Sequence, residues 1–100
     1  MEIIKNINNE EINFALVGRL DTTTAPSLDA AIAEVMPNAK KIIFDFAQLE
    51  YLSSAGLRVI LSTQKTIAAK NGEFIIRHVN DTIMDVFDMT GFTSILTIEK

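Results

Sequence analysis

Two adjacent hydroxyls, Ser53 and Ser54, are the residues of this sequence best placed to do chemistry. They stand between a run typical of a strand and a run typical of a helix, and the small residues Ala55 and Gly56 follow them. A serine at a helix start accepts a hydrogen bond from a backbone N–H two or three residues on, which stabilises the helix by ~1 kcal/mol. Ser53 fits this capping position, so Ser54 falls in the first helical turn with its hydroxyl directed outward.

A hydroxyl at a helix start is also suited to carry a phosphate. A phosphate on Ser54 would meet free backbone N–H groups and the positive end of the helix dipole. Small side chains at Ala55 and Gly56 would let a protein kinase close over the hydroxyl. Capping alone is the simpler interpretation of the serine pair, since serines commonly begin helices.

Asp45 is the next candidate, because it lies near the end of an apolar run, where parallel α/β domains place their sites. A phosphoacceptor aspartate would need a cluster of acids to hold magnesium, and Asp21 is the only candidate partner. We therefore interpret Asp45 as a loop-supporting carboxylate that accepts hydrogen bonds from the adjoining loop.

Catalytic and metal sites have little support in the sequence. His78 is the only histidine and there is no cysteine, so no zinc site is expected. No G-x-S-x-G segment, phosphate-binding loop or dinucleotide fingerprint is present. We predict a protein that is not an enzyme and that uses no metal and no cofactor.

The composition narrows the class of partner. Thirteen acidic residues against nine basic ones give a net charge of -4, which argues against binding to nucleic acid. No apolar stretch is long enough to cross a bilayer, and the N-terminus lacks the pattern of an export signal. We expect no membrane association and a cytoplasmic location.

Hydrophobic periodicity and turn residues predict the order β-β-α-β-α-β-α-β. A hairpin turning at Asn8 and Asn9 comes first, followed by a helix from Pro26 to Met36 and a strand at 42–46. A helix then starts at Ser53 and ends before Asn71, and a strand follows at 73–79. The last elements are a helix capped by Asn80 or Asp81 and closed by Gly91, and a strand at 94–98. This pattern predicts a single α/β domain over residues 1–100, with a mixed, largely parallel sheet and packed helices. Met84 and Met89 are predicted to fill the core of the domain.

Three segments together resemble the STAS-domain family, the anti-sigma-factor antagonists of bacteria. They are LVGRLDTTTAPSL, IIFDFAQLEYLSSAGLRVIL and VFDMTGFTSILTI, which follow one another in family order and span essentially the whole chain. The family's phosphorylation motif is usually written D-S-[ST]-G-L. By position, the phosphoacceptor serine falls on Ser54, and Ser53 replaces the motif's aspartate. The remaining motif positions are held by Ala55, Gly56, Leu57 and Arg58, of which Gly56 and Leu57 match.

The resemblance implies partner switching. The unmodified domain would bind a serine-kinase anti-sigma factor through the surface around Ser54 and the loop formed by Asp21, Thr22, Thr23 and Thr24, and this binding would release the sigma factor. The kinase would then phosphorylate Ser54 and end the interaction, and a serine phosphatase would reset it. Two alternatives stay open: a STAS module that binds a small ligand such as a nucleotide or lipid, or a non-phosphorylated scaffold in a sensory or transport assembly.

Overall fold

The chain opens with an antiparallel hairpin in the computed structural model, which describes residues 1–99. Its strands are β1 (Glu2–Asn8) and β2 (Glu11–Leu20). Asn9 turns the hairpin with a φ of 57°, a left-handed conformation that asparagine tolerates better than most residues. The hairpin predicted from the sequence is confirmed.

The other strands join the hairpin in parallel. They are β3 (Lys41–Leu52), β4 (Glu73–Arg77) and β5 (Thr97–Ile98). Within residues 1–99 the strand order is β1-β2-β3-β4-β5, with only the first pair antiparallel. This confirms the mixed, largely parallel sheet.

β3 is longer than the predicted strand at 42–46, because it continues to Leu52. Beyond Asp45 it pairs only with β2, through register shifts between Ala15 and Val17 and between Gly18 and Arg19. Gly18 has a φ of 104°, which a side chain would strain. As a result β2 and β3 end side by side, with Leu20 paired to Leu52.

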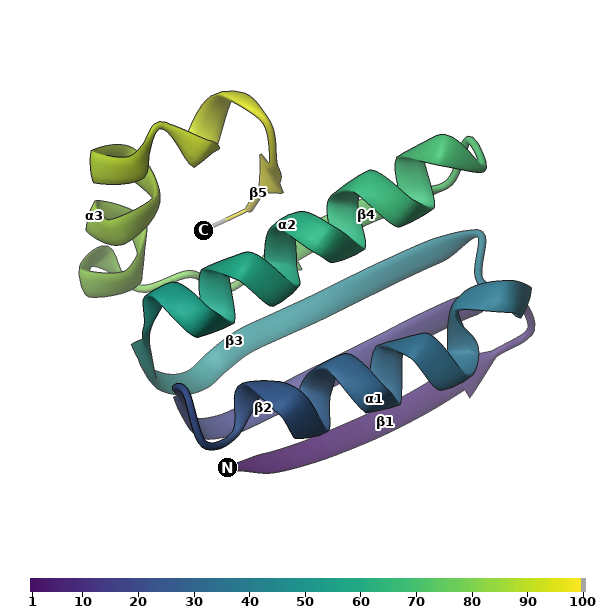
Figure 1. Ribbon diagram of the computed structural model, residues 1–100, viewed down its shortest axis with the longest axis horizontal. Coiled ribbons are helices and arrows are strands. Elements are labelled where there is room, and N and C mark those ends of the chain that lie inside the picture. The colour runs from purple at the N-terminus through teal and green to yellow at the C-terminus, as the bar shows by residue number, and fades with distance from the viewer. Residues whose placement is uncertain (100) are drawn as a thin grey trace.

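Three helices and two short 3-10 turns connect the strands of the described chain. They are α1 (Ala25–Val35), η1 (Met36–Asn38), α2 (Ser54–Ala69), α3 (Asp81–Thr90) and η2 (Phe92–Ser94). In Figure 1, α1 and α2 run side by side across the same face of the sheet. None of the helices within residues 1–99 combines the length and the apolar character that crossing a membrane requires.

The core fills the space between this face of the sheet and the helices. Phe44 is its centre: the ring is fully buried and lies 5.8 Å from that of Phe14 and 4.8 Å from that of Phe74, both edge to face. From α3, Ile83 and Phe87 reach the same core.

The two methionines of α3 differ. Met84 is half-buried and packs against the core as predicted, but the prediction for Met89 is wrong, because its side chain is 87% exposed. Met89 lies two residues after the buried Phe87, which turns it to the opposite side of the helix.

Candidate functional site

Ser54 is the first residue of α2, and it is exposed. Ser53 precedes it with extended backbone, and the Ser53 Oγ accepts a hydrogen bond from the Gly56 N–H at 3.3 Å. The Ser53 N–H donates to the Leu20 carbonyl at 2.9 Å. The predicted cap is confirmed, and it fixes the start of α2 against the end of β2, leaving the Ser54 side chain at the surface.

Gly56 was expected to keep space open for a kinase, but the structure shows that a glycine is needed here for packing. It is buried, and a Cβ at this position would lie 2.7 Å from Leu20 Cγ and 2.7 Å from Leu52 Cδ1. The glycine therefore lets α2 approach the ends of β2 and β3, and the prediction that it keeps a path open for a kinase is wrong.

The other motif positions divide between the core and the surface. Ala55 is half-buried and packs against the core, and Leu57 is a buried core residue. Arg58 is exposed one turn after Ser54. Ser54 and Arg58 are thus the motif side chains that a partner can reach most directly.

The loop before α1 is held together by Asp21. Its Oδ1 accepts hydrogen bonds from the Thr23 N–H at 3.0 Å, the Thr23 hydroxyl at 2.7 Å and the Thr24 N–H at 3.2 Å. The Thr24 hydroxyl donates to the Arg19 carbonyl at 2.8 Å. These bonds give the loop a defined shape, while Thr22 and Thr23 remain exposed.

The hydrogen bond from the Thr23 hydroxyl is the main cause that lowers the pKa of Asp21 below its ordinary value, with further lowering by the backbone N–H groups of Thr23 and Thr24. The carboxylate is therefore ionised at neutral pH. Because Leu20 adjoins Asp21 and accepts from Ser53, the loop lies beside the start of α2, as predicted. Figure 1 shows the β2–α1 connection and the beginning of α2 at the same end of the sheet.

Two residues at this end were missed from the sequence. The Arg19 guanidinium lies over the Tyr51 ring, with Cζ 4.2 Å from the ring centroid, and Arg19 Nε is 3.8 Å from Asp21 Oδ2. Arg19 and Tyr51 meet because the pairing of β2 with β3 sets them opposite each other. The contact could not be predicted, because the predicted strand ended at residue 46 and left Tyr51 in a loop.

Asp45 accepts hydrogen bonds as predicted, but not from the expected loop, because Ala47 belongs to β3 and His78 follows β4. Its Oδ1 lies 2.9 Å from the Ala47 N–H and 2.9 Å from His78 Nδ1. Partial burial raises the pKa of Asp45, but the bonds from His78 and Ala47 outweigh it, so the pKa is below its ordinary value. His78 has a φ of 59°, so the chain turns sharply as it leaves β4. Asp45 and His78 form a local pair that links β3 to this turn.

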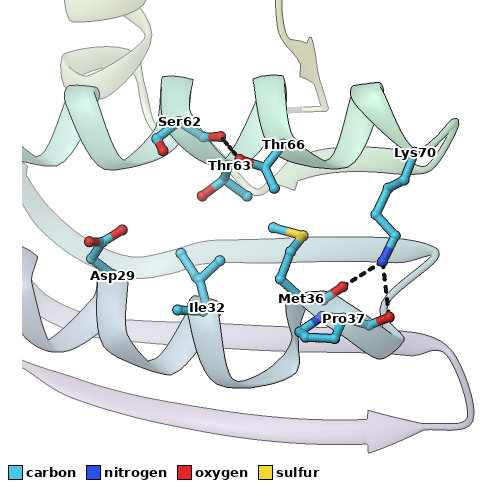
Figure 2. Close-up of a pocket in the computed structure, with 9 residues that line it drawn as sticks. Asp29, Ile32, Met36, Pro37, Ser62, Thr63, Thr66 and Lys70 are labelled. Carbon is cyan, nitrogen blue, oxygen red and sulfur yellow. Dashed lines mark hydrogen bonds between the residues drawn. The ribbon is translucent and has the colours of Figure 1, made fainter.

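An open groove lies elsewhere, between α1 and α2 (Figure 2). This open groove has a volume of about 430 Å³ and an apolar floor that includes Ile32 and Met36. The Lys70 ammonium at one end already donates to the carbonyls of Met36 and Pro37, and the hydroxyls of Thr63 and Thr66 donate within their own helix. The groove contains none of the predicted site residues. Within residues 1–99 no group of three or more acidic or histidine side chains could hold a metal ion.

The whole described fold has counterparts among known proteins. The profile of the STAS domain matches residues 2–100. BtrV of Bordetella bronchiseptica is 32% identical over 84 residues, which are 83% of this chain and 72% of that protein. The anti-sigma-B factor antagonist of Listeria monocytogenes is 26% identical over 99 residues, covering 97% of this chain and 86% of that one.

Solved structures show the same fold. The anti-sigma factor antagonist SpoIIAA in its unphosphorylated form superposes with a TM-score of 0.87 at 20% identity, over 99% of this chain and 89% of that one. The phosphorylated form of Bacillus SpoIIAA superposes with a TM-score of 0.80, also at 20% identity, over 99% of this chain and 92% of that one. The resemblance seen in the sequence is confirmed: this chain belongs to the STAS domain family.

Proposed function

We propose that this protein is an anti-sigma factor antagonist, which binds a serine-kinase anti-sigma factor and is switched off by phosphorylation of Ser54. The observation that carries the proposal is the exposed Ser54 hydroxyl at the start of α2, beside the ordered loop at 21–24. Relatives of similar length are named anti-sigma factor antagonists, and one member of the fold has been solved with and without a phosphate.

In the unmodified state, Ser54 and the loop at 21–24 lie at the same end of the sheet, where Ser53 bonds to Leu20. Both parts are fixed before a partner arrives: Ser53 ties α2 to β2, and Asp21 orders the loop. A preorganised surface loses little conformational freedom on binding, so more of the interaction energy appears as affinity. The kinase that docks here meets its own substrate hydroxyl.

Phosphorylation transfers the γ-phosphoryl group of the kinase's ATP to Ser54 Oγ, with ADP as the leaving group, and the hydroxyl proton passes to a base of the kinase. The domain is the substrate of this reaction and supplies no catalytic group. A phosphate adds a charge of about -1.5 to -2, which opposes a fitted interface by repulsion and by the cost of desolvation.

The neighbours of Ser54 leave this new charge largely uncompensated. Arg58 is the nearest cation along the helix, but an exposed pair four residues apart contributes only about 0.3–0.5 kcal/mol. Ser53 caps the helix without adding a second negative charge beside the phosphate. The free N–H groups and the dipole at the start of α2 supply only about half a unit of positive charge, so most of the negative charge of the phosphate still faces the partner. A serine phosphatase would restore the hydroxyl, and the cycle takes place in the cytoplasm.

The test is a binding experiment with purified serine-kinase anti-sigma factors of the source organism, each loaded with its sigma factor. Wild-type protein is expected to displace the sigma factor from one of them, Ser54→Ala to do the same, and Ser54→Asp to do so at least tenfold less well. Ser62→Asp is the matched control, because Ser62 is an exposed serine of the same helix, two turns away. Displacement by Ser54→Asp that equals displacement by the control would refute the switch, and failure of the wild type with every kinase would refute the function.

A further inference from the structure

The only tyrosine of the chain is also its most exposed aromatic residue. Tyr51 is 41% exposed at the end of β3, three residues before Ser54. The phenylalanines lie inside: Phe92 is half-buried, and five others are buried, namely Phe14, Phe44, Phe46, Phe74 and Phe87. Leaving a large ring in water forgoes the favourable free energy of burying it, so the packing of the domain does not explain this placement.

The exposed ring is nevertheless held in place. The Arg19 guanidinium lies 4.2 Å above it, and Arg19 Nε is 3.8 Å from the Asp21 carboxylate. The other oxygen of Asp21 is fixed by the bonds from Thr23 and Thr24. Tyr51, Arg19 and Asp21 thus form a connected row that runs from the end of β3 into the loop before α1.

The row adjoins the surface around Ser54. Arg19 pairs with Tyr51 and Leu20 with Leu52 in the register of β2 and β3. Since Leu20 and Leu52 point into the core, the alternation of side chains along a strand turns Arg19 and Tyr51 toward the opposite face. A partner that covers Ser54 and extends over the end of the sheet where β2 and β3 finish therefore meets Tyr51 and Arg19 next.

We propose that Tyr51 and Arg19 anchor the kinase on this surface; the inference rests on the function proposed above. Tyrosine and arginine are the residue types that dominate binding energy at protein interfaces, especially where they are rigid before binding. The matching surface of the kinase has an apolar slot for the Tyr51 ring and an acidic side chain beside it. That acid pairs with the guanidinium N–H donors of Arg19 that Asp21 leaves free.

Calorimetric titration of the kinase identified above tests the proposal. Tyr51→Ala and Arg19→Ala are each expected to weaken binding by at least tenfold, whereas Tyr51→Phe keeps the ring and is expected to stay within about threefold of the wild type. Met89→Ala is the matched control, because it removes an exposed apolar side chain from the end of α3 and is expected to leave the affinity unchanged. Thermal unfolding of each variant checks that the fold is retained.

Phosphorylation kinetics give an independent readout. Because Ser54 is intact in Tyr51→Ala, KM for the domain as substrate is expected to rise at least tenfold while kcat changes less than twofold. If wild-type protein binds and is phosphorylated but Tyr51→Ala and Arg19→Ala match it, the anchor is refuted and the switch stands. If the wild type itself does not bind, the proposed function fails and the anchor fails with it.

Discussion

Gly56→Ala tests how closely α2 packs on the ends of β2 and β3. In an exposed helix, replacing glycine by alanine stabilises by about 1 kcal/mol. Here the added Cβ would lie 2.7 Å from carbons of Leu20 and Leu52, about 1 Å inside normal contact. Both leucines are buried, at 0% and 5% exposure, so neither has free space to move into.

Overpacking of this kind costs about 1–3 kcal/mol, and the upper part of that range applies because two core side chains must shift together. After the gain in helix propensity is subtracted, Gly56→Ala is expected to lower the free energy of unfolding by about 1–2 kcal/mol. For a domain of this size that corresponds to a fall in Tm of about 4–16 °C.

Urea unfolding and calorimetry measure the change. Ala30→Gly is the control, because Ala30 is an exposed residue in the middle of α1 whose replacement reports helix propensity alone, about 1 kcal/mol of destabilisation. Combining Gly56→Ala with Leu52→Ala should cost less than the sum of the single changes, since the new methyl occupies space that Leu52 vacates. A Gly56→Ala protein more stable than the wild type would refute the close packing.

Two further predictions concern the ends of the strands. Asn80→Ala removes both the cap on the Ile83 N–H, at 2.8 Å, and the bond to the Leu49 carbonyl, at 3.2 Å, so urea unfolding should show a loss of about 1–2 kcal/mol. Asn80→Ser can keep the cap without placing a charge beside the Leu49 carbonyl and should lose less; equal losses would contradict this. The lowered pKa of Asp45 means that its ionised form stabilises the fold above the unfolded-state pKa, near 3.8, and that this contribution is lost as the pH falls through the lower folded pKa. Carboxylates titrate between about pH 5 and about pH 2, so over this range the free energy of unfolding of Asp45→Asn should fall less than that of the wild type. Unfolding curves with the same pH dependence for both proteins would contradict this.

Local signals predicted most of the architecture. Asn9 predicted the turn of the hairpin. Asn80 caps the start of α3 and Gly91 ends it with a φ of 77°, both as expected. The serine cap was also found correctly, because it depends only on neighbouring residues: Ser53 accepts from Gly56, three positions on. Features that depend on a few successive residues are within reach of sequence reasoning.

Long-range packing was not within reach. The second half of β3 has mixed polarity and is a strand only because β2 follows it through two register shifts. The reason for Gly56 lies in Leu20 and Leu52, and Leu20 is thirty-six positions away in the sequence. The pair of Asp45 with His78 likewise joins residues thirty-three positions apart. Each depends on how distant segments meet in space, which no local pattern encodes.

Phosphosite mapping is the most direct test of the account, which depends on the Ser54 hydroxyl being the group that a kinase modifies. Purified protein is incubated with the serine-kinase anti-sigma factor and ATP, and the intact mass and its fragments are measured. We expect a single added phosphate located on Ser54, and none on Ser54→Ala under the same conditions. A phosphate that maps to another side chain, or a wild-type mass that stays unchanged with a kinase that binds the domain, would contradict the account.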